Sequence, residues 1–352
     1  MVARIAIDAA GLVGSAELEP SPAGCSMSHA AARTEIPTAL DAERGEVACR
    51  LALRHAGARD VRIAWELNGP ADAPLLIVAG GISANRHTLA SAAFPETGWW
   101  DEQRGFGIDP TRFRVLSIDW VGADGSIDAP IDSADQADAV AAVLDALQLP
   151  QAVAWIGSSY GAMSGLQFAQ RHPQRLRGLV VISGAHRAHP FASAWRALQR
   201  RIAALGLESG DENAGLSLAR QLAMLSYRTP EEFAARFTEG TTVDGDVVRV
   251  AAEDYLDACG ARFIGRMPPV AYRRLSESID LHHADPAQVK VPTTVVAIAE
   301  DRLVPLPDML DLSAKLPHSE LHVLRSHYGH DAFLKETSAI ARVLRAAIET
   351  ST

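Results

Sequence analysis

The sequence predicts an α/β fold in which helices cover both faces of a mostly parallel sheet and a helical segment is inserted into the sheet domain. Short, continuous apolar runs recur along the chain, and such runs are typical of strands buried on both faces of a parallel sheet. They alternate with helical patterns, as in doubly wound proteins. The alternation stops between residues 186 and 286 and then resumes, which indicates the insertion.

The composition is that of a globular protein and restricts the classes of partner. Hydrophobic residues make up 48% of the 352 residues, and the formal net charge is −10. This acidic balance argues against a nucleic-acid partner, because phosphate binding requires a basic face. Three scattered cysteines, Cys25, Cys49 and Cys259, lack the spacing of a disulfide framework or a metal site and suit a reducing compartment. No signal-peptide pattern or membrane-spanning apolar run is present, so we expect a soluble, cytoplasmic protein without a membrane partner.

The elements of the sheet domain are predicted from local patterns. Residues 1–42 lack periodicity and are predicted to be a flexible leader. Strands are expected at Val47–Arg54 and Val61–Leu67, before a turn at Asn68-Gly69-Pro70. Residues 43–185 and 287–352 then form the core. It contains buried strands at Leu75–Ala79, Val115–Ile118, Ala152–Ile156, Leu179–Ile182 and Thr294–Ile298, and helices at Ala134–Leu147 and Ala332–Ile348.

Residues 186–286 are predicted to form a helical lid. Leu218, Leu222 and Leu225 fall on one helical face. The stretch Thr229–Glu232 fits a capping box with Pro230 at the first helical position, so another helix begins there.

The stretch Gly157-Ser158-Ser159-Tyr160-Gly161 fits the pattern G-x-S-x-G. A predicted strand precedes it and a helix follows, which is the context of the nucleophile elbow in the α/β-hydrolase fold. Glycines stand two positions before and after the serine, at Gly157 and Gly161, because the sharp turn has no room there for larger side chains. We therefore predict Ser159 as the nucleophile; Ser158 is not central in the pattern.

A serine hydroxyl needs a base, and this fold supplies an acid and a histidine from loops after late strands. Asp301 follows the strand Thr294–Ile298, and His330 follows a strand at Leu321–Leu324. His330 would take the proton of Ser159, and Asp301 would orient the imidazole. Glu300 is the rival acid.

An oxyanion hole is also required. One donor is normally the N–H after the nucleophile, here that of Tyr160. The second should come from the loop Gly80–Ser83 after an early strand. We choose the N–H of Ile82, with the neighbouring positions of the loop as alternatives.

Arginines gather in the lid of this acidic chain. A basic stretch at its start would suit phosphates or a carboxylate, or would be a solvated helix face. Arg228 immediately precedes the capped helix, where a guanidinium makes a plausible carboxylate site. The stretch comprises Arg187, Arg196, Arg200 and Arg201.

Motifs spread over residues 46–348 carry a resemblance to a known family. The stretch from Tyr328 to Leu334, which includes Gly-His-Asp-Ala-Phe-Leu, is the most specific of them. The chain resembles the MetX-type homoserine O-acyltransferases of the α/β-hydrolase fold. The other matching pieces are Gly98-Trp99-Trp100, Gly157–Met163, Gln199-Arg200, Ser226-Tyr227-Arg228, Tyr255-Leu256 and Asp301–Pro305.

The resemblance implies ping-pong acyl transfer without a metal or a resident cofactor. An acyl-CoA co-substrate would acylate Ser159, and the hydroxyl of L-homoserine would then take the acyl group for methionine synthesis. Arg228 would bind the carboxylate of the amino acid and Asp331 its ammonium. The resemblance also implies a homodimer.

The resemblance leaves the donor and the acceptor open. Members that use succinyl-CoA look similar to this chain around Arg196, and a cation there would pair with the succinyl carboxylate. We therefore favour succinyl-CoA over acetyl-CoA, and homoserine over serine. The elbow has Tyr160-Gly161-Ala162 where the family usually has Met-Gly-Gly, and the segment between Asp119 and Ala134 is short. Either departure would alter a substrate pocket.

Two other functional classes remain open. An esterase or thioesterase would use the same three residues with water as the acceptor. Arg228 and Asp331 argue against it, because an esterase for apolar substrates needs neither. A non-catalytic binding protein of the same fold would have no need of the intact serine, acid and histidine.

Overall fold

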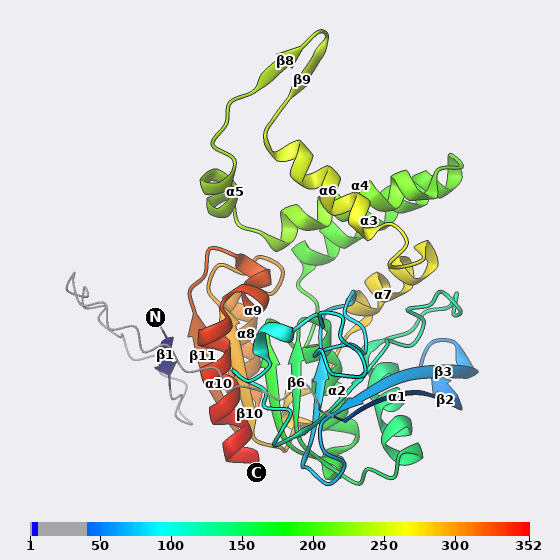
Figure 1. Cartoon of the computed structure of the whole chain (residues 1–352), viewed down its shortest axis with the longest axis vertical. Helices are drawn as coiled ribbons and strands as arrows, with labels where there is room; N and C mark the ends of the chain where they lie inside the picture. The colour runs from blue at the N-terminus through cyan, green and yellow to red at the C-terminus, as the bar shows by residue number, and fades with distance from the viewer. Residues whose placement is uncertain (1, 6–40) are drawn as a thin grey trace, which may run out of the picture.

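The computed structural model describes residues 2–5 and 41–352 (Figure 1). Their strands form one nine-stranded sheet, in the order β1-β11-β10-β7-β6-β4-β5-β3-β2, and a separate hairpin. The six strands from β11 to β5 run parallel, whereas β1, β3 and β2 are antiparallel to their neighbours. The predicted α/β fold with a mostly parallel sheet is confirmed. The strands are β1 (Val2–Ile5), β2 (Ala42–Leu53), β3 (Gly57–Asn68), β4 (Leu75–Ala79), β5 (Arg114–Ile118), β6 (Ala152–Ser158), β7 (Leu176–Ile182), β10 (Thr293–Ile298) and β11 (Ser319–Leu324).

The sheet separates two apolar cores. Leu75 and Ile77 of β4 belong to the core shared with the helices α1 and α2, and Leu76 and Val78 belong to the core shared with α10. This alternation explains why the buried strands read as continuous apolar runs, because both faces of each strand are covered. The covering helices are α1 (Ser133–Ala146), α2 (Tyr160–Arg171), α8 (Leu306–Lys315) and α10 (Thr337–Ser351).

The ends of the sheet domain differ from the expectation. Most of the predicted leader, residues 1–42, lies outside the described residues. Of its described part, β1 pairs with β11 at one edge of the sheet and Ala42 opens β2. The helix expected at Ala332–Ile348 is divided into α9 (Ala332–Lys335) and α10, because Glu336 has a non-helical ψ of 51°.

The chain leaves the sheet after β7 and returns to it at β10. The intervening segment lies over the carboxyl ends of the strands (Figure 1). Its first two helices approach closely at two glycines. A Cβ atom added to Gly206 would lie only 2.5 Å from the Cα of Gly215. The elements are α3 (Pro190–Glu208), α4 (Glu212–Tyr227), α5 (Pro230–Arg236), the hairpin strands β8 (Thr242–Asp244) and β9 (Val247–Arg249), α6 (Ala252–Phe263) and α7 (Pro269–Leu281).

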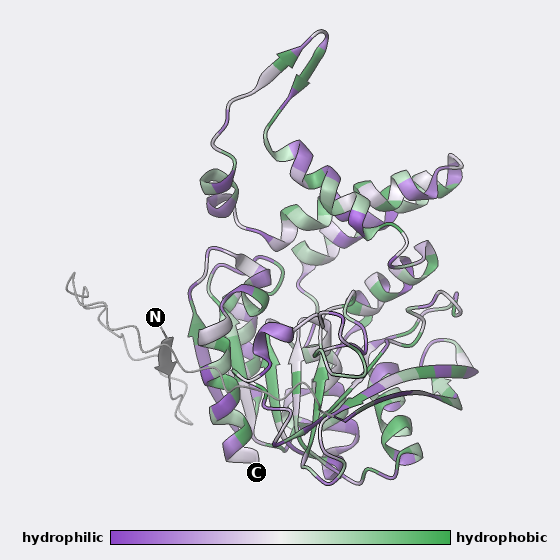
Figure 2. Cartoon of the chain, in the orientation of Figure 1, coloured by the Kyte–Doolittle hydropathy of each residue, from purple (hydrophilic) through white to green (hydrophobic). Residues whose placement is uncertain are grey.

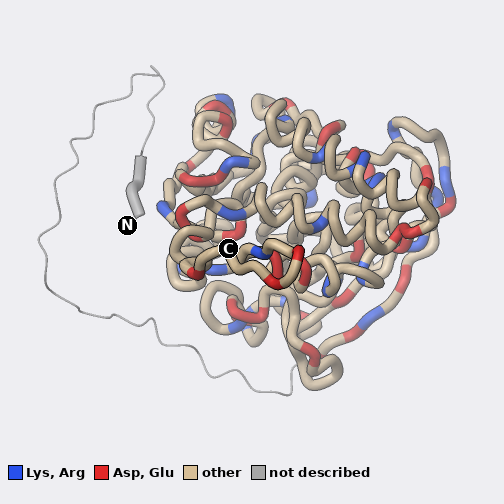
Figure 3. Tube along the Cα trace, turned by 90° about the horizontal axis from the view of Figure 1, so that it is seen from above, with Lys and Arg blue, Asp and Glu red and all other residues tan. Residues whose placement is uncertain are grey.

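The outer surface is mixed in character. Acidic and basic positions are interspersed along the chain (Figure 3). Hydrophobic residues concentrate in the strands, but they also recur on the protruding β8–β9 hairpin (Figure 2). No helix among the described residues is both long enough and apolar enough to cross a membrane.

Candidate active site

Ser159 stands in a strained turn between β6 and α2. Its φ of 53° and ψ of −117° lie outside the regions that L-residues favour. The turn is held by a hydrogen bond of 2.8 Å from the N–H of Ser159 to the carbonyl of Ile182. A Cβ atom on Gly161 would lie 2.1 Å from the carbonyl oxygen of Ala79. The glycine of the motif is therefore required because the helix and the neighbouring strand touch here.

Three predicted residues meet at this turn. The Nε2 atom of His330 lies 2.9 Å from Oγ of Ser159, and its Nδ1 atom lies 2.7 Å from Oδ2 of Asp301. Asp301 follows β10 and His330 lies in the short helix η4 (Gly329–Asp331) after β11. The topology thus brings three loop residues from separate strand ends to one point.

The carboxylate of Asp301 is fixed from its other side. Its Oδ1 atom accepts hydrogen bonds from the N–H groups of Leu303, at 2.8 Å, and Val304, at 3.0 Å. The rival acid, Glu300, instead accepts hydrogen bonds from the side chain of Arg325 and the N–H of Ser326. Of the two acids, only Asp301 contacts the imidazole.

The electrostatics around His330 favour its protonated form. Burial acts to lower the pKa of the imidazole, but the charge and the hydrogen bond of Asp301 outweigh it, so the pKa lies above the ordinary value of 6.5. The imidazole of His330 can therefore accept a proton from Ser159, and Asp301 stabilises the resulting imidazolium.

Ile82 and Tyr160, which are predicted to supply the oxyanion donors, line the same cavity as Ser159. The N–H of Tyr160 is at the first position of α2, where a helix has no carbonyl of its own to offer. Ile82 lies in a turn closed by a 3.0 Å hydrogen bond from Ala84 N–H to Gly81 O, and its N–H donates to no group in the described part of the chain. Trp120 holds this turn through its indole N–H, 3.0 Å from the carbonyl of Gly81.

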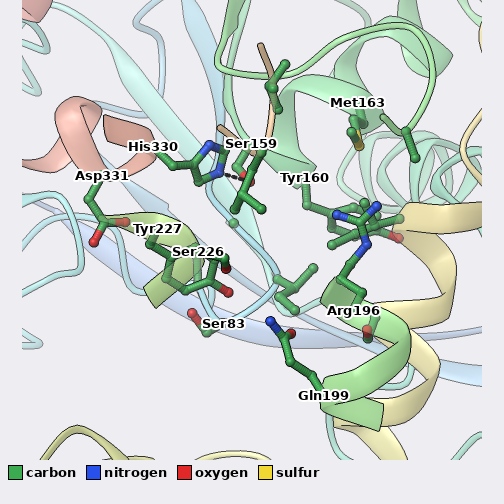
Figure 4. A pocket seen from close by; sticks show the side chains of 18 of the residues that line it. Ser83, Ser159, Tyr160, Met163, Arg196, Gln199, Ser226, Tyr227, His330 and Asp331 are labelled. Carbon is green, nitrogen blue, oxygen red and sulfur yellow. Dashed lines mark hydrogen bonds between the residues drawn. The ribbon is translucent and has the colours of Figure 1, made fainter. Parts of the chain in front are cut away.

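A cavity of about 270 Å³ opens above Ser159, and residues of both the sheet domain and the inserted segment line it. In Figure 4, Asp331 and Tyr227 lie on one side of Ser159 and Arg196 with Met163 on the other. The cavity therefore has two differently charged sides. Among the described residues, no group of three or more histidine, cysteine or acidic side chains is placed to hold a metal ion.

Arg228 is not among the residues that line the cavity. Its Nη1 donates to Glu232 at 2.9 Å, and its Nε lies 3.0 Å from Oδ2 of Asp331. That second contact is an ion pair without a hydrogen bond, because the N–H is not directed at the oxygen. The sequence-based placement of Arg228 against a substrate is therefore not reproduced, because two protein carboxylates already surround its guanidinium.

A different arginine of the inserted segment, Arg220 on α4, reaches the cavity. It lines the cavity with Tyr227 and Asp331, and its guanidinium lies 5.4 Å from the ring centre of Tyr227 and 5.0 Å from that of Phe263. No carboxylate among the described residues pairs with it. This half-buried cation is thus available to an anionic ligand.

Arg196 lies in the cavity wall, as its assignment to the acyl group requires. The side chain is buried and paired with Asp280 at 2.6 Å. Burial lowers the pKa of its guanidinium and Asp280 partly opposes this shift. Trp99 also lines the cavity and stacks on Trp100 with ring centres 5.3 Å apart; the sequence linked this pair to the family but not to the cavity.

Comparisons with known proteins extend these observations. A profile of the alpha/beta hydrolase fold matches residues 74–337. The chain is 57% identical over 324 residues to a homoserine O-succinyltransferase of Xanthomonas campestris pv. campestris, covering 91% of this chain and 87% of that protein. It is 32% identical over 286 residues to a homoserine O-acetyltransferase of Thermus thermophilus, covering 72% and 73%.

The likeness extends to solved structures. The crystal structure of a homoserine O-acetyltransferase from Bacillus anthracis superposes with a TM-score of 0.77, covering 88% of this chain and 98% of that chain. At 14% sequence identity this likeness concerns the fold alone. On the strength of the sequence relatives, the chain belongs to the homoserine O-acyltransferase family within the α/β-hydrolase fold.

Proposed function

We propose that this enzyme is a homoserine O-succinyltransferase, which moves the succinyl group of succinyl-CoA to the hydroxyl of L-homoserine, a step of methionine synthesis. The observation that carries the proposal is the hydrogen-bonded chain Asp301–His330–Ser159 below a cavity that is lined by Arg196, Arg220 and Asp331. The 57% identity with a homoserine O-succinyltransferase supports the same donor and acceptor.

The first half-reaction acylates the serine. His330 Nε2 takes the proton of Ser159 as Oγ attacks the thioester carbonyl, and the N–H groups of Ile82 and Tyr160 stabilise the oxyanion. Collapse of the tetrahedral intermediate breaks the C–S bond, and the departing CoA sulfur receives the proton from His330. The product is the acyl ester of Ser159.

The second half-reaction repeats the chemistry with the amino acid. The homoserine hydroxyl gives its proton to His330 and attacks the ester, and Ser159 leaves with that proton. Asp331 faces the cavity and would bind the ammonium group. Because Arg228 is engaged by Glu232 and Asp331, we assign the carboxylate to Arg220 and give Arg228 the role of holding Asp331.

The donor preference is assigned to the opposite side of the cavity. Arg196 lies there, and a succinyl carboxylate stripped of water needs a cationic partner. An acetyl group carries no charge that could pair with the guanidinium of Arg196. Because acyl-CoA thioesters are intracellular metabolites, we also propose that the enzyme acts in the cytoplasm.

We also propose that the enzyme is a homodimer assembled through the inserted segment. Leucines on its first two helices are exposed although they are large and apolar, which is typical of an interaction surface. They are Leu198, Leu205, Leu207, Leu218 and Leu225.

An assay of CoA release tests the reaction. Purified enzyme is given succinyl-CoA or acetyl-CoA, each with homoserine, serine or no amino acid. We expect release that requires homoserine and is fastest with succinyl-CoA. Ser159→Ala should reduce the rate by about 10⁶-fold, as loss of a triad nucleophile does elsewhere, while keeping the melting temperature. Release without any amino acid would instead identify a thioesterase.

A further inference from the structure

One carboxylate in the inserted segment binds two arginines. Asp280 lies on α7, and its Oδ1 atom is 2.8 Å from Nε and 2.6 Å from Nη2 of Arg196. Its Oδ2 atom accepts a hydrogen bond of 2.7 Å from Nη1 of Arg200. The hydroxyls of Ser193 and Ser276 accept further hydrogen bonds from the same two guanidiniums, at 3.1 and 3.0 Å.

The cluster carries a surplus positive charge. Arg196 and Arg200 stand four residues apart on α3, where like charges repel each other. Asp280 supplies a single negative charge against the two cations. The side chains of Arg196, Arg200 and Asp280 are only 11%, 19% and 20% exposed, so salt and water screen these charges weakly. The cluster, which contributes Arg196 to the cavity wall, therefore carries a net charge of about +1.

Only one edge of the cluster reaches the cavity. Arg196 lines the cavity, whereas Asp280 and Arg200 do not. Asp280 and Ser193 engage Nε and Nη2 of Arg196, and Nη1 has no protein partner in the described part of the chain. Figure 4 shows Arg196 on the side of Ser159 opposite to Asp331, to which the ammonium group of the amino acid is assigned.

We propose that Asp280 is the positioning residue that sets the preference for acyl groups ending in a carboxylate. It holds Arg196 against the cavity with the Nη1 edge free, and it offsets the repulsion of Arg200 without cancelling the surplus charge. A guanidinium fixed in this way loses little side-chain entropy when a carboxylate binds. The inference rests on the proposed function, because it presumes that an acyl-CoA enters this cavity.

The test compares succinyl-CoA with butyryl-CoA, whose acyl group has the same number of carbons and no charge. Affinities are measured by calorimetry in the Ser159→Ala enzyme, which cannot turn over. We expect the parent to bind succinyl-CoA more tightly. Asp280→Asn should reduce the ratio of the two affinities at least about ten-fold, or about 1.4 kcal/mol, and Asp280→Glu should restore part of it.

Asp128→Asn is the matched control. Asp128 also bridges two arginines, Arg273 and Arg274 of α7, but on the exposed surface and away from the cavity. It should leave the ratio of affinities unchanged. If the freed arginines prevent Asp280→Asn from folding, adding Arg200→Gln removes their repulsion, and the same loss is expected.

The outcomes separate this inference from the proposed function. An unchanged ratio in the Asp280 variants, or an equal loss of both affinities, would overturn the role of Asp280. Failure of the unmodified enzyme to use homoserine would overturn only the assignment of homoserine as the acceptor, because the binding measurement needs no acceptor. If neither thioester binds, both proposals are wrong.

Discussion

At the scale of single residues, the charge state of His330 governs the proposed chemistry. The base must be neutral to accept the proton of Ser159, and its pKa lies above 6.5 because Asp301 outweighs the effect of burial. We therefore expect kcat/KM for acylation to rise with pH through a value above that of an ordinary histidine. Measuring kcat/KM between about pH 5 and 9 locates this limb.

The Asp301→Asn variant checks the cause. Without the carboxylate, burial is no longer outweighed and Asp331 remains as a weaker influence that raises the pKa of the imidazole. The limb should therefore move to lower pH while the rate falls on the order of 10⁴-fold. A limb that stays in place would show that Asp301 does not set the pKa. Stability changes in the opposite sense: a raised folded-state pKa stabilises the fold below the unfolded value, and this contribution is lost as the pH rises through the folded pKa.

A second residue-scale prediction separates Arg220 from Arg228. Arg220→Gln should raise the KM for homoserine about ten-fold or more, as expected for the loss of a charged hydrogen bond, with little effect on the KM for succinyl-CoA. It should also abolish the preference for homoserine over 3-amino-1-propanol, which lacks the carboxylate. Arg228→Gln should keep that preference and raise the KM for both acceptors alike. Burial raises the pKa of the Asp331 carboxyl and Arg228 opposes this rise. Without Arg228, the carboxylate that is proposed to bind the ammonium group of either acceptor is less favoured. The reverse pattern would return the carboxylate to Arg228.

These two arginines show where sequence reasoning reaches its limit. Ser159, Asp301 and His330 could be chosen because each follows a recognisable strand and strand ends of a parallel sheet meet at one edge. Arg220 and Arg228 are both arginines of the inserted segment, and what distinguishes them is the backbone conformation at each position. Arg220 lies within α4, whereas Arg228 follows its last residue with an extended backbone, φ −102° and ψ 160°. No spacing rule states which guanidinium then faces the cavity.

At the scale of elements, Tyr160 joins the nucleophile turn to the inserted helices. Its hydroxyl lies 2.5 Å from Oγ of Ser278 on α7, and both side chains are fully buried. Its ring packs edge-on against Trp120, which holds Gly81. Tyr160 is recognisable in the sequence as a departure from the family. Its partner Ser278 is not, because it lies 118 residues away.

A double-mutant cycle tests this link. Tyr160→Phe should destabilise the fold by about 1–3 kcal/mol, since it leaves the hydroxyl of Ser278 buried without a partner. Ser278→Ala should also destabilise the fold, because it removes the Ser278 partner of the buried Tyr160 hydroxyl. The double variant should be less destabilised than the sum of the single variants, as measured by denaturant unfolding. Additive losses would mean that the two hydroxyls do not interact.

The elements themselves were predictable where burial is strongest. The run Leu75–Ala79 is β4 at the same residues, and the runs that became β5 and β6 differ from the structure only at their ends. The β8–β9 hairpin escaped prediction because its strands are short and exposed. Its signal was present, however: Gly245-Asp246 is the two-residue loop between the paired residues Asp244 and Val247, and Gly245 at its first position has a φ of 60°.

At the scale of the whole molecule, the first two helices of the inserted segment combine a residue that lines the cavity with exposed leucines. On α3, Arg196 lies in the cavity wall while Leu198 and Leu205, seven residues apart, are 49% and 63% exposed. On α4, Leu218 and Leu225 show the same spacing and are 54% and 43% exposed. Leucines that repeat every seven residues suit packing against partner helices, which supports the proposed homodimer.

We expect Leu205→Glu combined with Leu218→Glu to convert the dimer into monomers, because a dimer would bury both charges. Sedimentation velocity over a range of protein concentrations measures this, with Leu310→Glu on α8, outside the inserted segment, as the control that stays dimeric. A monomeric parent enzyme would refute the assembly outright. If the parent is dimeric, the monomeric variant should also lose kcat/KM for succinyl-CoA, because a partner packed on the outer face of α3 would restrain the helix that presents Arg196. An unimpaired monomer would show that Asp280 and the surrounding helices hold Arg196 without help from the second subunit.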